Sequence, residues 1–136
     1  MRSVHCSVVV HRPVAAVFAY AADPDHLPRW ASGLAQSEVR RDGETLLVGS
    51  PMGDVRVRFV GPNPYGVLDH EVTLPDGSAT LNPFRVLSHP EGSELLFTVR
   101  QGALSDADLE RDAATVQADL ERLRDLLEAG PDGRAG

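Results

Sequence analysis

The chain has 136 residues, of which 42% are hydrophobic, a size and composition typical of one compact domain, here expected at residues 1–129. Its formal net charge is −7 and its 13 basic residues, all arginines, are scattered, which argues against a nucleic-acid partner and excludes lysine-dependent chemistry. No apolar run is long enough to span a membrane and the N-terminus lacks a secretory signal, so we expect a cytoplasmic protein without membrane insertion.

Residues 1–31 predict a strand followed by two short helices. Residues 4–10 are mostly β-branched and apolar, and this run stops at Arg12-Pro13, which is typical of a strand. Apolar residues then recur with helical spacing over residues 14–22. Asp23-Pro24 combines an N-cap residue with a proline suited to a first helical turn, and so predicts a second short helix that carries Trp30.

Residues 37–102 predict six antiparallel strands, because their hydrophobic period changes to two and turn signals recur at regular intervals. The turns are expected at residues 42–43, 51–54, 61–64, 75–77 and 90–92. Together with the first strand, these segments give a curved antiparallel sheet of about seven strands.

The last predicted element is a long helix. Ser105 is expected to cap its start, and acidic residues crowd its first two turns, where they favour the helix dipole. Gly130-Pro131 ends it, and residues 130–136 are expected to be disordered. Spacings of 4, 3, 4, 3 and 4 define an apolar seam, made by Leu109, Ala113, Val116, Leu120, Leu123 and Leu127. We expect this seam to pack on the sheet; a coiled-coil dimer is the alternative.

Turn lengths predict which side chains share the sheet face under this helix. A two-residue loop at Asp76-Gly77 and a three-residue loop at residues 90–92 both place His70 and Arg85 on the apolar face. Such polar groups on an apolar face are typical of a ligand site. His70 could instead be a satisfied core histidine, and a loop miscounted by one residue would turn Arg85 to solvent.

No metal or cofactor site is expected. The five histidines lack metal-ligand spacing, and Cys6, the only cysteine, lies in an apolar run where it resembles a buried hydrophobic residue. The sequence also lacks a G-x-S-x-G elbow, a P-loop and a G-x-G-x-x-G motif. A general acid or base would have to be His70.

Two segments resemble a known superfamily: RPVAAVFAYAADPDHLPRW in the first half and DLERLRDLLE near the end. They are similar to the START-like (SRPBCC) superfamily, in particular to its small bacterial polyketide cyclase/dehydrase-type members. The resemblance runs from Val4 to Glu128 and implies the helix-grip fold, of class α+β, with a cavity for an apolar ligand between sheet and long helix. It also implies that Trp30 matches the tryptophan near the end of the family's second helix.

The main functional hypothesis is therefore binding of a small hydrophobic ligand, such as a lipid, polyketide or aromatic compound, with or without cyclase or dehydrase activity. The expected walls are Trp30, Phe59, Leu68 and Phe97, and the expected polar groups, which are also the catalytic candidates, are His70 and Arg85. The alternative is a non-enzymatic interaction or regulatory protein, a homodimer whose cavity is filled with side chains.

Overall fold

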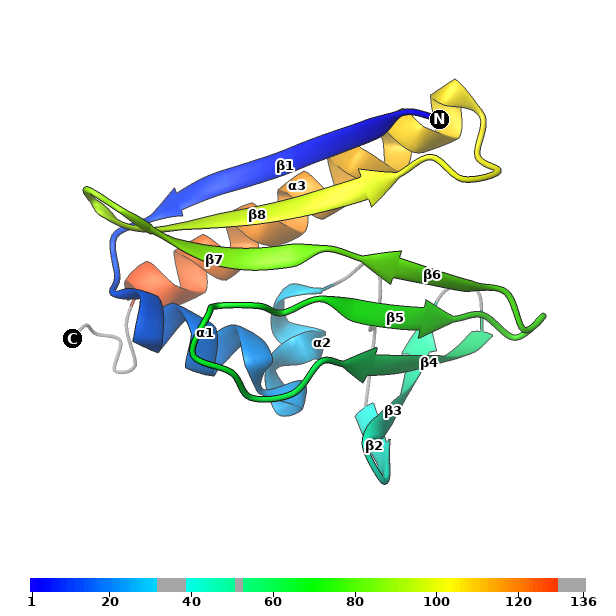
Figure 1. The fold of residues 1–136 in the computed structure, drawn as a ribbon, viewed down its shortest axis with the longest axis horizontal. Coiled ribbons are helices and arrows are strands. Elements are labelled where there is room, and N and C mark those ends of the chain that lie inside the picture. The colour runs from blue at the N-terminus through cyan, green and yellow to red at the C-terminus, as the bar shows by residue number, and fades with distance from the viewer. Residues whose placement is uncertain (32–38, 51–52, 130–136) are drawn as a thin grey trace.

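The protein has the expected α+β class and helix-grip arrangement, with curved antiparallel sheets and a long C-terminal helix (Figure 1). The computed structural model describes residues 1–31, 39–50 and 53–129, so the tail expected to be disordered lies outside the described residues. The elements are β1 (Ser3–Val10), α1 (Val14–Ala22), the 3-10 helix η1 (Pro24–His26), α2 (Leu27–Trp30), β2 (Val39–Asp42), β3 (Thr45–Ser50), β4 (Gly53–Phe59), β5 (His70–Thr73), β6 (Ala79–Asn82), β7 (Phe84–His89), β8 (Gly92–Arg100) and α3 (Asp106–Ala129).

The strands form two sheets, whereas we expected a single sheet of about seven strands. One has the order β1-β8-β7 and the other the order β2-β3-β4-β5-β6. The break falls at Pro83, between β6 and β7. Its carbonyl accepts a hydrogen bond from the Thr98 N–H at 3.0 Å, but proline has no N–H with which to return one. Among the described strands β6 therefore pairs with β5 alone, and β8 draws away from it (Figure 1).

A short segment before β5 joins the two sheets. The Leu68 N–H donates to the Phe84 carbonyl and the Val86 N–H to the Gly66 carbonyl, both at 2.8 Å. Residues 66–68 thus continue the β5 edge along β7. The direction in which β5 starts, and with it the placement of His70, depends on this pairing.

The predicted strand registers were wrong by one residue at both hairpins. Thr73 pairs with Ala79, and the Leu74 N–H donates to the Ser78 carbonyl. The first loop therefore holds three residues, Pro75 to Gly77, and not two. The Asp76 carboxylate accepts hydrogen bonds from both the N–H and the hydroxyl of Ser78, which stabilises this longer loop. At the second hairpin, residue 89 pairs with residue 92, which leaves two residues in the loop and not three.

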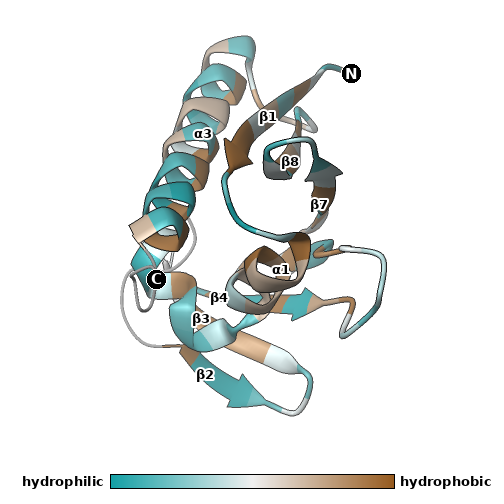
Figure 2. Cartoon of the chain, turned by 90° about the vertical axis from the view of Figure 1, so that its left-hand side faces the viewer, coloured by the Kyte–Doolittle hydropathy of each residue, from teal (hydrophilic) through white to brown (hydrophobic). Residues whose placement is uncertain are grey.

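Helix α3 covers β1 and β8 with the predicted apolar seam, and Figure 2 shows it running alongside β1. Leu109, Leu120 and Leu123 are fully buried, and Val116 is half-buried. The seam is covered within the chain, so the coiled-coil alternative was wrong. The predicted cap is confirmed, because the Ser105 hydroxyl accepts a hydrogen bond from the Asp108 N–H at 3.1 Å.

The two short helices after β1 occur as predicted, with η1 between them. The Asp23 carboxylate accepts a hydrogen bond from the Asp25 N–H and so caps the 3-10 turn. Helix α2 then ends on Trp30, whose carbonyl accepts a hydrogen bond from Arg122 of α3 at 3.0 Å. This contact fixes α2 against the long helix. Among the described residues, no helix combines the length and the apolar character that crossing a membrane would need.

Candidate functional site

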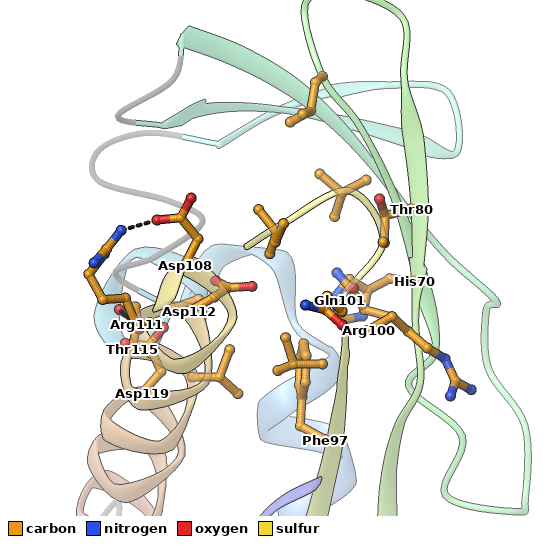
Figure 3. Close-up of a pocket in the computed structure, with 18 of the residues that line it drawn as sticks. His70, Thr80, Phe97, Arg100, Gln101, Asp108, Arg111, Asp112, Thr115 and Asp119 are labelled. Atoms are coloured by element: carbon orange, nitrogen blue, oxygen red, sulfur yellow. Dashed lines mark hydrogen bonds and ion pairs between the residues drawn. The ribbon is translucent and has the colours of Figure 1, made fainter. Parts of the chain in front are cut away.

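A cavity of about 690 Å³ lies between α3, α2 and the inner faces of the two sheets. Its wall is mostly apolar deep inside and more polar toward solvent (Figure 3). The volume falls in the range of small-molecule binding sites. The lining residues include Leu27, Trp30, Phe59, His70, Val72, Phe97, Val99, Val116 and Leu120.

One part of the cavity wall lies where β6 and β8 separate. Thr80 and Asn82 of β6 form one side of it, and Arg100 and Gln101 at the end of β8 form the other. The sheets divide here because Pro83 ends the pairing of β7 with β8. The separation of β6 from β8 thus begins at a residue that cannot donate a main-chain hydrogen bond.

Four of the six expected site residues line this cavity: Trp30, Phe59, His70 and Phe97. Leu68 is buried elsewhere and lines a second, smaller cavity of about 140 Å³, which it shares with Phe59. Arg85 lines neither of these two cavities.

The placement of Arg85 corrects the prediction that it faces the helix. With the observed loop lengths, Arg85 pairs with Leu96 and Val67, and its side chain lies on the outer face, 45% exposed. There it donates two hydrogen bonds of 2.8 Å to Asp69, from Nε to Oδ1 and from Nη2 to Oδ2. The single-residue shift in each hairpin therefore reversed the side-chain face.

Asp69 joins this ion pair to the backbone, since its Oδ1 also accepts a hydrogen bond from the Phe84 N–H at 2.8 Å. The hydrogen bonds from Arg85 lower the pKa of the Asp69 carboxyl. The lowered pKa means that the ionised carboxylate stabilises the folded state. This stabilisation is complete at pH values above the pKa of the unfolded chain, about 3.9, and is lost as the pH falls through the lower pKa of the folded protein.

We expect Asp69→Asn to lower the free energy of unfolding at neutral pH by about 1–3 kcal/mol, nearer the lower figure because Arg85 is half exposed. The difference from wild type should shrink as the pH falls below about 4. Urea unfolding at several pH values measures both effects. Glu71→Gln, an exposed position of β5 two residues further along the chain, is the control and should change little. An equal loss in both variants would contradict this role for Asp69.

His70 is the one histidine among the lining residues and is only 4% exposed. Its ring lies among aromatic side chains, with centroids 4.8 Å from Phe59, 5.7 Å from Phe97 and 6.3 Å from Phe84. Burial lowers the pKa of His70, so the neutral imidazole is favoured. The Nδ1 atom lies 2.9 Å from the Leu68 carbonyl, which only accepts hydrogen bonds, so Nδ1 carries the proton.

It follows that Nε2 of His70 is an unprotonated nitrogen with a lone pair. An atom of this kind can accept a hydrogen bond from a ligand or remove a proton from it. Its orientation is held by the Leu68 carbonyl, two residues earlier in the same edge of the sheet.

Trp30 closes the α2 side of the cavity and is 4% exposed. Its ring packs against Phe84, with centroids 5.9 Å apart. Its indole Nε1 is the one buried side-chain nitrogen or oxygen in the described part of the chain that has no hydrogen-bond partner. Trp30 is thus a wall residue whose polar atom is covered by its neighbours.

The wall formed by α3 was not anticipated from the sequence. Five polar residues of the helix line the cavity, one of which is Arg111. The other four lie on one stripe: Asp108, Asp112, Thr115 and Asp119. Their spacing of 4, 3 and 4 repeats that of the apolar seam, displaced by one residue toward the N-terminus. This parallel stripe is the signal in the sequence that could have identified them, but only Asp108 and Asp112 were considered, as acidic residues of the first two turns that favour the helix dipole.

Metal ligands do not gather in the described part of the chain: no group of three or more His, Cys, Asp or Glu side chains is placed to hold an ion. Cys6 is buried, with its Sγ 3.5 Å from the Ala113 carbonyl, and burial raises the pKa of its thiol. The cavity wall thus offers His70 and the carboxylates of α3 as its chemical groups.

Comparison with known families agrees with this architecture. Residues 1–128 match the model of the family described as polyketide cyclase / dehydrase and lipid transport. The chain belongs to that family. The expected relationship to the START-like superfamily is thereby confirmed, and the cavity described above occupies the place that this relationship implied. No curated protein sequence matches the chain.

Solved structures of low sequence identity share the fold of this family member. The Aha1 dimer from Colwellia psychrerythraea is similar with a TM-score of 0.77 and 14% identity, over 96% of this chain and 98% of that one. Protein CV1439 from Chromobacterium violaceum has a TM-score of 0.68 and 15% identity, over 94% and 99%. DynU16, a putative protein in the dynemicin biosynthetic locus, has a TM-score of 0.73 and 19% identity; the match covers 94% of this chain and 48% of DynU16.

Proposed function

We propose that this protein binds a small apolar molecule in the cavity between the two sheets and α3. The observation that carries the proposal is the cavity itself, about 690 Å³, with aromatic and aliphatic walls and few polar groups deep inside. The family description, which includes lipid transport, supports the same type of ligand. The cytoplasmic location expected from the sequence remains part of this proposal.

A cyclase or dehydrase step at this site would use His70 as its base. Its Nε2 is unprotonated, and the aromatic rings around it would exclude water from a bound ligand. Arg85, the other catalytic candidate from the sequence, is given no part in this step, because its guanidinium is held by Asp69 on the outer face.

The alternative, an interaction protein with a filled cavity, has less support. It required Trp30, Phe59 and Phe97 to close the interior, yet all three lie in the wall of an open cavity. A homodimer remains compatible with ligand binding, and the similar fold of the Colwellia dimer keeps it a prediction.

The only tryptophan of the chain lines the cavity, so its fluorescence reports on ligand entry. We expect native mass spectrometry of freshly purified protein to detect a bound small molecule. We also expect N-phenylnaphthylamine to quench Trp30 emission in a saturable way. Absence of both an adduct and saturable quenching would contradict the proposal.

A matched pair of variants tests the location of binding. Val116→Phe adds a ring on the cavity side of α3 and should weaken N-phenylnaphthylamine binding by at least about tenfold. Ala118→Phe adds the same group on the exposed side of the helix and should leave the affinity unchanged. Equal affinities of the two variants would place the dye outside this cavity.

A further inference from the structure

Charged side chains line the cavity at five positions: Arg100, Asp108, Arg111, Asp112 and Asp119. Most of them are already engaged with other groups. Arg111 donates a hydrogen bond to Asp108, as the dashed line in Figure 3 marks. Asp119 is buried and accepts a hydrogen bond of 2.8 Å from Arg122. These pairs neutralise each other and leave little charge for a ligand.

The two remaining charged side chains, Arg100 and Asp112, point in different directions. Arg100 donates to the Ser3 hydroxyl at 3.0 Å, and its guanidinium points away from α3 (Figure 3). Asp112 points toward the sheet, and no hydrogen bond or ion pair joins it to another described residue. Partial burial raises the pKa of this carboxyl, because it disfavours the charged form. The uncompensated charge in the cavity is therefore negative.

The deep polar group on the opposite wall is also an acceptor. Nε2 of His70 forms no hydrogen bond within the described residues. The one fully buried side-chain nitrogen or oxygen without a partner in that part of the chain is Trp30 Nε1, so Nε2 of His70 keeps some accessible surface. Since His70 is nearly buried and lines the cavity, the surface that Nε2 keeps faces the cavity. A group that lies against His70 must bring a donor.

We propose that the ligand is a neutral aromatic compound with a hydroxyl group that donates a hydrogen bond to His70 Nε2, and that Asp112 excludes carboxylic acids from the cavity. The proposal rests on the proposed function, because it names the class of molecule that this cavity would hold. The rings of Phe59, Phe84 and Phe97 around His70 favour an aromatic partner at this position.

A carboxylate would be unfavourable at both walls. Its oxygens accept hydrogen bonds, so they would meet the lone pair of Nε2 without a proton between them. Its charge would also be repelled by the Asp112 carboxylate, a repulsion that water and salt weaken because Asp112 is partly exposed. A phenol or enol avoids both costs, since it is uncharged and supplies the missing proton.

Three naphthalene probes of similar shape test the proposal on the wild-type protein: β-naphthol, its methyl ether and β-naphthoate, measured by calorimetry near neutral pH. We expect β-naphthol to bind about tenfold more tightly than the methyl ether, which lacks the donor, and at least about tenfold more tightly than the naphthoate. Equal binding of all three would overturn this inference while leaving the proposed function intact. Failure of every probe to bind, together with no adduct in native mass spectrometry, would instead count against the proposed function.

Variants then assign each preference to its residue. Asp112→Asn should strengthen naphthoate binding several-fold and keep the preference for naphthol over its ether. Glu110→Gln removes the same charge two residues away on the exposed face and should leave naphthoate binding unchanged at physiological salt. His70→Phe should abolish the preference for naphthol over the ether. If His70→Phe does not fold, the three probes on the wild-type protein and the Asp112→Asn variant still test the proposal. Unchanged naphthoate binding in Asp112→Asn would refute it.

Discussion

Replacing Leu123 by aspartate should unfold the protein. Leu123 is fully buried in the apolar seam of α3 and is not one of the residues that line the cavity, so a carboxylate there could not reach solvent through it. Losing a buried leucine costs about 2–5 kcal/mol, and burying an unpaired carboxylate adds to that cost. The sum approaches the whole stability of a domain, about 5–15 kcal/mol.

Circular dichroism and thermal melting provide the measurement. We expect Leu123→Asp to show no cooperative transition. Ala118→Asp introduces the same side chain on the exposed side of the same helix and should lose only about 1 kcal/mol, mainly through helix propensity. A wild-type melt for Leu123→Asp would mean that the seam is not the core of the fold.

Gly66→Ala is expected to produce the second large loss. Gly66 has φ +73°, and a Cβ at this position would lie 2.3 Å from the Val86 carbonyl oxygen. That contact is with backbone, so the strand itself would have to move. The same region holds the hydrogen bond from the Val86 N–H to the Gly66 carbonyl, which joins the two sheets. We expect a loss of at least about 3 kcal/mol in the free energy of unfolding.

Gly43→Ala is the matched control for this effect. Gly43 has a similar φ of +65°, but no atom lies within 4 Å of the position a Cβ would occupy. Gly43→Ala should lower the free energy of unfolding only by the cost of placing alanine in the left-handed backbone conformation, about 1–2 kcal/mol. Urea unfolding separates the two contributions, and equal losses in both variants would show that the contact with Val86 is relieved at no cost.

The fold was predictable because its signals are local. The cap at Ser105 and the spacing of the seam lie within one helix, and the Asp23-Pro24 pair marks the turn that starts the next. Each of these signals involves residues a few positions apart. Such short-range patterns determine the type and order of most elements. The division of one predicted strand into β6 and β7 at Pro83 was not expected.

Strand register was not predictable in the same way, because it depends on single residues in the loops. Gly92 was expected to be the last residue of a three-residue loop, yet it belongs to β8. Its lack of a side chain serves a distant contact, since a Cβ there would lie 2.6 Å from the Val10 carbonyl oxygen. No pattern around Gly92 contains that information. The resulting shift removed Arg85 from the candidate site and left His70 in it.

The division of the sheet at Pro83 also bears on how a ligand would enter and leave the cavity. In the described structure no ladder hydrogen bonds connect β6 with β8, so the two strands can move apart without breaking main-chain pairing. Leu109, Leu123 and Leu127 of the α3 seam do not line the cavity and would stay packed during such a movement. If the cavity binds a ligand as proposed, a widening of the gap between β6 and β8 would break no main-chain pairing between these two strands.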